Sequence, residues 1–76
     1  MPHVIIKLYA GRSEQQKARL ADEVTKAVMA GAGCDADAVS VAVEDVAPND
    51  WAEKVYKPDI AAHPDRLYKK PGYNPL

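Results

Sequence analysis

The sequence predicts an α/β protein of a single domain, residues 1–76, built as a β-α-β unit with two parallel strands and one long helix per protomer and completed by dimerisation. Three observations predict this fold class. Apolar and polar residues alternate in two short segments, and apolar residues recur at helical spacing between those segments. A chain of 76 residues also buries too little apolar surface to be comfortably stable alone.

The first strand is expected over residues 2–9. Val4, Ile6 and Leu8 fall on one face of this segment, and the residues between them fall on the other face. The segment is rich in β-branched residues, which suit a pleated surface. Pro2 fits there because proline is tolerated at the first position of a strand.

A long helix is expected from about Ser13 to Ala30. Ser13 and Gln16 have the spacing of a capping box, in which each side chain satisfies a free backbone N–H of the other residue. Apolar residues then recur at helical spacing. Gly31 and Gly33 are expected to end the helix, because glycine readily adopts the left-handed conformation found at helix ends.

A second strand is expected after the helix. Val39, Val41 and Val43 alternate with smaller or polar residues until Pro48 breaks the pattern. Two strands joined through a helix are expected to run parallel, because the helix carries the chain back to the starting edge of the sheet.

Beyond the second strand the pattern is irregular. Asp50 and Glu53 are spaced to cap a short helix, which Pro58 is expected to end or kink. Another short helix is expected over residues 64–70, and residues 71–75 are expected to form an extended tail.

Composition excludes several classes of function. Ten basic and eleven acidic residues give a net charge of −1 with no basic run, so nucleic acid is not an expected partner. No apolar stretch approaches the ~20 residues of a membrane span and no signal peptide is evident, so we expect a cytoplasmic protein with no membrane partner. With one cysteine, Cys34, and no metal-ligand spacing, neither a disulfide nor a metal is expected. Stability is then expected from a homo-oligomer, most simply a two-fold dimer.

Pro2 is the first candidate for catalysis. Once Met1 is removed, its nitrogen becomes a secondary amine at the start of the chain. A terminal amino group titrates near ~8, and apolar neighbours such as Val4 and Ile5 together with a nearby cation lower that value. A general base works best near neutrality. The alternative interpretation is that Pro2 merely begins an edge strand.

Several local motifs, taken in order, resemble the 4-oxalocrotonate tautomerase family. They are Pro2 opening a strand, Gly11-Arg12-Ser13 at the first turn, Glu14-Gln15-Gln16-Lys17 at the helix start and Val39-Ser40-Val41 in the second strand. The similarity covers about residues 2–51. The tail, with Lys69-Lys70-Pro71-Gly72-Tyr73, is similar to the longer, dimeric bacterial members of the PptA type rather than to the shorter hexameric ones, although a hexamer stays open.

The resemblance implies a keto-enol tautomerase that acts on a small 2-oxo acid or its enol, without a cofactor and with Pro2 as the general base. It implies that Arg12 binds the substrate carboxylate or polarises its carbonyl. It also implies that Trp51 walls the pocket, although a tryptophan in this chain could equally anchor a core or an interface. These residues are catalytic and substrate-binding candidates, and no metal is implied.

Ser40 departs from the pattern of the family, which has an arginine at this position of the second strand. A hydroxyl offers a hydrogen bond but not the bidentate charged contact that a guanidinium makes with a carboxylate. A monocarboxylate with an apolar remainder, such as an arylpyruvate enol, is therefore favoured over a dicarboxylate.

Two other functions stay open at this point. The chain could be a hydratase or dehalogenase of an unsaturated acid, with Glu53 activating water. It could also be a catalytically weak oligomeric binding protein, if Ser40 in place of arginine disables the site.

Overall fold

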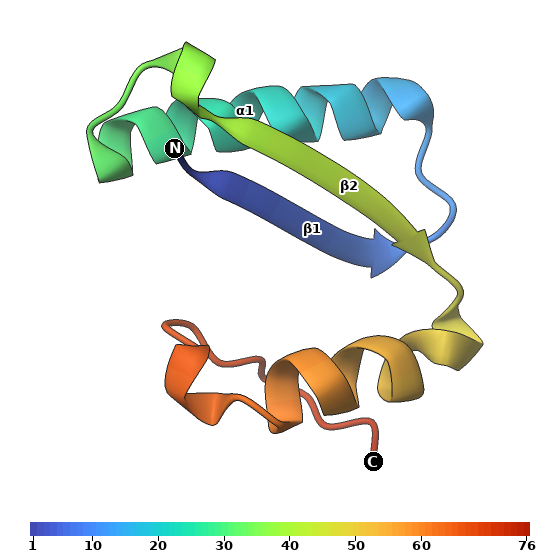
Figure 1. Cartoon of the computed structure of the whole chain (residues 1–76). Coiled ribbons are helices and arrows are strands. Elements are labelled where there is room, and N and C mark those ends of the chain that lie inside the picture. Colours follow the sequence, from blue (N-terminus) through green and yellow to red (C-terminus); the bar gives the residue numbers. More distant parts are fainter.

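The computed structural model describes residues 1–76 and has the predicted β-α-β unit (Figure 1). Strand β1 (His3–Tyr9) and strand β2 (Ser40–Val46) flank helix α1 (Glu14–Ala32) in the sequence. The strands pair in parallel over their full length, with His3 opposite Ser40 at one end and Tyr9 opposite Val46 at the other. The predicted fold class is therefore confirmed, with strand boundaries within one residue of those expected.

Helix α1 begins at the predicted capping box and ends later than predicted. The Ser13 hydroxyl accepts a hydrogen bond from the Gln16 backbone N–H at 3.1 Å, and the Gln16 side chain accepts one from the Ser13 backbone N–H at 3.0 Å. Gly31 lies inside the helix, so the predicted end at Ala30 is wrong. Gly33 is the cap, at φ 69°, and its N–H donates to the Met29 carbonyl.

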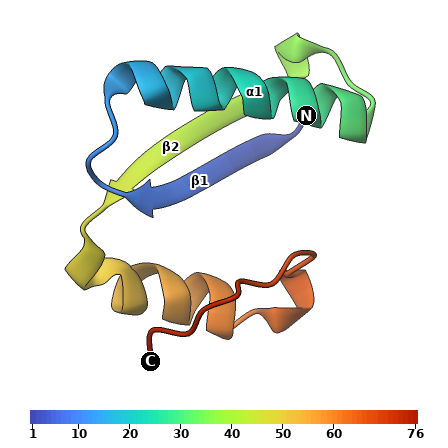
Figure 2. The same ribbon diagram turned by 180° about the vertical axis from the view of Figure 1, so that it is seen from behind.

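The two faces of the sheet look toward different parts of the chain. Asp45, which lies beside Leu8 in the register, accepts a hydrogen bond at 2.9 Å from Lys17 of α1. The even-numbered face of β1 is therefore the one that α1 covers. On the opposite face, Lys7 of β1 forms an ion pair at 2.5 Å with Asp59 from the C-terminal part of the chain. Figure 2 shows this arrangement from behind, with the sheet between α1 and the C-terminal segment.

The C-terminal segment differs from the prediction in both of its short helices. A π-helix spans Ala52–Ala61 and contains Pro58, which neither ends nor breaks it. In an α-helix an internal proline kinks or breaks the helix, because its ring clashes with the carbonyl four residues back. The π-helix has a different hydrogen-bond spacing, from each N–H to the carbonyl five residues back, as between Ala62 and Lys57. The second helix is a single 3₁₀ turn, Pro64–Arg66, rather than a helix over residues 64–70.

The predicted cap of the first short helix is also wrong. No side chain caps the start of the π-helix. Asp50 instead pairs with Lys54 at 3.3 Å, and Glu53 pairs with Lys57 at 2.5 Å. Both acids lie four residues before a lysine, and this spacing places the two side chains side by side on the helix surface. The acids therefore form ion pairs instead of capping the helix.

The core of the isolated chain is very small. Only Val55 and Tyr56 are buried, and both lie in the π-helix. Ile5, on the face of the sheet that α1 does not cover, keeps 55% of its surface exposed. Each strand also has an unpaired edge, because the sheet has two strands. Part of one sheet face, around Ile5, and two sheet edges are therefore left for another molecule to cover.

Candidate active site

Pro2 lies directly before β1 and is held by the backbone of β2. Its carbonyl oxygen accepts a hydrogen bond from the Ser40 N–H at 3.1 Å, and the residue is half-buried. The preceding Met1 is fully exposed. While Met1 is attached, the Pro2 nitrogen is an amide without basicity, and it becomes an amine when Met1 is removed.

Ser40 lies beside Pro2, and its side chain is hydrogen-bonded to His3, the residue after Pro2. The Ser40 hydroxyl and His3 Nδ1 are 2.6 Å apart, and the two residues are direct partners in the strand register. Ser40 is thus held to Pro2 through its backbone and to His3 through its side chain. The sequence places His3 next to Pro2 but does not predict its contact with Ser40, because only the register between the strands places the two residues opposite each other.

Arg12 lies in the turn that follows β1. Gly11 adopts φ 129° there, a conformation open to glycine but strained for other residues. The Arg12 Nη1 donates to the Tyr9 carbonyl at 3.3 Å, and the guanidinium forms no ion pair with an acid of this chain. The side chain is exposed, so most of its five donors are free for an external carboxylate.

Trp51 belongs to an aromatic cluster at the same end of the sheet as Arg12. Its ring meets the Tyr9 ring edge-on, with centroids 5.2 Å apart. Its Nε1 donates a hydrogen bond to the Tyr73 hydroxyl at 2.9 Å, and Tyr73 in turn packs on Tyr56 at 5.7 Å. The tail residue Tyr73 therefore fixes the indole, a contact that the sequence pattern did not predict.

The four predicted site residues fall into two groups at opposite ends of the sheet. Pro2 and Ser40 lie where both parallel strands begin, whereas Arg12 and Trp51 follow the ends of β1 and β2 (Figure 1). At about 3.3 Å per residue, the seven steps from Pro2 to Tyr9 span about 23 Å. One protomer does not bring the four side chains together around a small substrate.

The other side chains with possible chemistry do not join either group. Glu53 is occupied by Lys57 on the exposed surface of the π-helix. No three His, Cys, Asp or Glu side chains lie in an arrangement that could hold a metal ion. Each of the helices is too short or too polar to be a membrane-spanning segment. A cavity in the C-terminal segment is lined by none of the four predicted residues.

Comparisons with known proteins agree with this β-α-β architecture. Residues 2–55 match the profile of the family described as tautomerase enzyme. A protein of Xylella fastidiosa described as a probable tautomerase is 50% identical over the whole chain and 93% of its own length. Tautomerase PptA of Pectobacterium carotovorum is 36% identical over 97% of this chain and 99% of its own.

A solved structure gives the same result. It is that of TomN, a 4-oxalocrotonate tautomerase homologue in the tomaymycin biosynthetic pathway, with a TM-score of 0.63 and 36% identity over 66% of this chain and 77% of that one. The profile covers the whole β-α-β unit, and the curated relatives extend the match through the tail. This chain therefore belongs to the 4-oxalocrotonate tautomerase family and is an enzyme, an isomerase of the cofactor-independent kind.

Proposed function

We propose that this protein interconverts the keto and enol forms of a small 2-oxo acid, with the Pro2 nitrogen as the general base after removal of Met1. The observation that carries the proposal is the position of Pro2 at the start of β1, with its carbonyl held by the Ser40 N–H at 3.1 Å. A proline fixed in this way presents its ring nitrogen in a defined direction. In ketonisation the nitrogen takes the proton from the enol oxygen and returns a proton to the carbon at the other end of the enol double bond, while the carbon that carries the oxygen becomes the carbonyl carbon.

The half-buried position of Pro2 favours an unprotonated base. A terminal amine titrates near ~8 in water, and partial removal from solvent disfavours its charged form. A substrate-binding arginine nearby would disfavour that charged form further, because two cations repel each other. Both effects move the base toward the neutral pH at which it works best.

The site is completed in a homodimer, in which a second copy brings Arg12 and Trp51 to Pro2. Three observations support this part of the proposal: the separation of about 23 Å along the strand, the exposed Ile5 face and the unpaired strand edges. A two-fold axis perpendicular to the strands makes the strands of the two copies antiparallel. The Pro2 end of one copy then lies beside the Arg12 and Trp51 end of the other.

In this arrangement each residue has a separate role. Arg12 binds the substrate carboxylate through its free donors and stabilises the negative charge that develops on the enolate oxygen. Trp51, fixed by Tyr73, forms an apolar wall. Ser40, held by His3, offers a hydroxyl where a family arginine would offer a charge, so the substrate is a monocarboxylate with an apolar or aromatic remainder.

An ultraviolet assay tests the proposal. The processed protein is given phenylenolpyruvate, a monocarboxylate, and 2-hydroxymuconate, a dicarboxylate, and intact mass establishes that Met1 is absent. Pro2→Ala and Arg12→Ala should each lower kcat/KM for phenylenolpyruvate by about 100-fold or more. Unchanged rates in either variant would overturn the assigned site, and equal turnover of the two enols would overturn the preference for monocarboxylates.

A further inference from the structure

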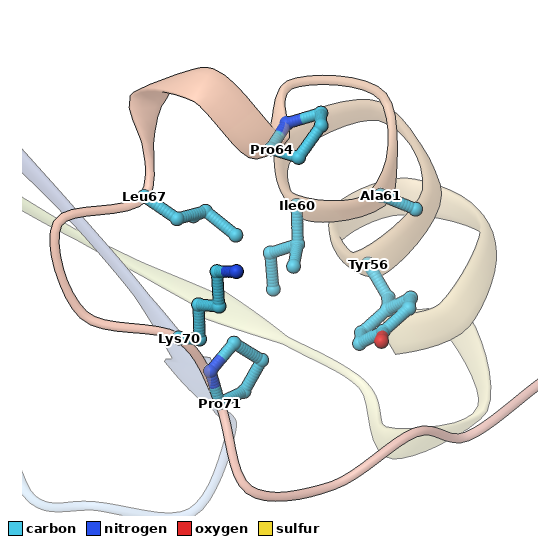
Figure 3. Close-up of a pocket in the computed structure, with 7 residues that line it drawn as sticks. All are labelled: Tyr56, Ile60, Ala61, Pro64, Leu67, Lys70 and Pro71. Atoms are coloured by element: carbon cyan, nitrogen blue, oxygen red, sulfur yellow. The ribbon is translucent and has the colours of Figure 1, made fainter.

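The C-terminal segment contains a cavity that the proposed active site does not use. Its volume is about 260 Å³. Its lining comes from the end of the π-helix, the following 3₁₀ turn and the start of the tail, and consists of Tyr56, Ile60, Ala61, Pro64, Leu67, Lys70 and Pro71. Figure 3 shows these side chains grouped around the hollow, with aliphatic carbon and the Tyr56 ring forming most of the wall.

Lys70 is the one charged group in this lining. Its amine end is directed toward Ile60 and Leu67 rather than away from the hollow (Figure 3). Five of the other lysines form ion pairs within the chain, but Lys70 forms none, and no acid lines the cavity. An ammonium group facing an apolar wall without a counter-ion favours an anion that has an apolar body.

We propose that this cavity is a binding site for a small monocarboxylate with an aromatic or branched aliphatic body, whose carboxylate pairs with Lys70. The size fits this class, because a cavity of about 150 Å³ holds benzene and 260 Å³ leaves room for a short acid side chain. Pro64 and Pro71 restrict the backbone on two sides of the hollow. A wall that is rigid before binding loses little freedom when a ligand enters.

A second copy of the chain is the competing occupant. Tyr68 is fully exposed and lies between the lining residues Leu67 and Lys70 in the sequence, so it could enter the hollow of a partner. A tyrosine ring would fill the apolar part but would leave the Lys70 ammonium covered and without an acid, which is costly. In contrast, an acid with an apolar body fills the apolar part of the cavity and also gives the Lys70 ammonium a counter-ion.

Chemical-shift mapping by NMR tests this site directly. The probes are 3-phenylpropionate and its uncharged counterpart 3-phenylpropan-1-ol, added to the full chain at up to millimolar concentration. We expect the acid to shift the backbone amide signals of Ile60, Ala61 and Leu67, and the alcohol to bind at least about tenfold more weakly because it lacks the charged contact.

Two lysine variants separate the Lys70 contact from general surface charge. Lys70→Met should weaken binding of the acid at this site by about tenfold or more. Lys69→Met changes the net charge equally and removes only a hydrogen bond at 3.4 Å to the Lys70 carbonyl, not the Lys70 ammonium, so the affinity of this variant should match that of the unaltered protein. Both residues are exposed, and neither substitution threatens folding. Absent shifts, equal binding of acid and alcohol, or equal losses in the two variants would each overturn the proposal.

Ligand binding in the cavity and catalysis at Pro2 can be tested separately. Arg12→Ala protein should keep the shifts at Ile60, Ala61 and Leu67, because Arg12 does not line the cavity. Loss of those shifts in Arg12→Ala would place the ligand at the catalytic site, where Arg12 holds the carboxylate, and overturn the second site. Tautomerase activity that survives Pro2→Ala would overturn the catalytic proposal and leave the cavity site untouched.

Discussion

Mixing two inactive variants should restore activity if the active site takes Pro2 from one copy and Arg12 from another. Pro2 and the end of β1 are about 23 Å apart, so no small substrate bridges them within one chain. When equal amounts of the Pro2→Ala and Arg12→Ala chains assemble at random, half of the active sites receive an intact Pro2. Half of those sites also receive an intact Arg12 from the neighbouring chain. About one quarter of the wild-type activity should therefore return, whether the assembly is a dimer or a larger ring.

The assay is ketonisation of phenylenolpyruvate after equal amounts of the two variants have been unfolded together and refolded. Each variant treated alone is the first control. The second control mixes the double variant, Pro2→Ala with Arg12→Ala, with wild-type chains: a shared site again gives about one quarter of full activity, whereas a site within one chain gives about one half. A mixture of the single variants that is no more active than its components would refute the shared site.

Three further outcomes are expected. Gly33→Ala should lower the free energy of unfolding by about 1–2 kcal/mol, because Gly33 caps α1 at φ 69°. Gly31→Ala, inside the helix, should raise the free energy of unfolding by about 0.5–1 kcal/mol. If urea titrations gave the same change in stability for the Gly31→Ala and Gly33→Ala variants, the assigned helix end would be contradicted. The hydrogen bond to Asp59 raises the pKa of Lys7 above 10.5. The contribution of this ion pair to the free energy of unfolding is therefore complete below pH 10.5 and is lost as the pH rises through the raised pKa. In the Asp59→Asn variant the Tm should therefore fall less steeply at alkaline pH than in the unaltered protein. Parallel curves of Tm against pH for the two proteins would contradict this. Ser40→Arg should raise the turnover of 2-hydroxymuconate relative to phenylenolpyruvate by about tenfold, and an unchanged ratio would remove Ser40 from substrate selection.

The β-α-β unit could be predicted because its signals are local. Alternation around Ile6 and Val41 sets the strands, and the Ser13 cap sets the start of the helix. The helix end was misjudged because both Gly31 and Gly33 are able to stop a helix and only the backbone conformation distinguishes them. Helix rules that assume α geometry also failed at Pro58, which a π-helix accommodates.

The candidate site could be predicted residue by residue but not as an assembly. Pro2 and Arg12 carry recognisable chemistry in the sequence, whereas their separation follows from strand length and their proposed meeting depends on a second copy. The contact between His3 and Ser40 depends on the register of two strands that are far apart in the sequence. The Lys70 cavity depends on how the tail folds back on the π-helix, which no local pattern encodes.

The protonation state of the Pro2 nitrogen decides whether this residue can act as the general base. Protein purified from cells, labelled with ¹⁵N at proline and checked by intact mass for removal of Met1, is titrated by NMR. If Pro2 is the general base, its nitrogen is a free secondary amine that loses its proton below the usual terminal-amine pKa of about 8. A nitrogen still joined to Met1, or one that keeps its proton above about pH 9, would contradict the assignment of Pro2 as the general base.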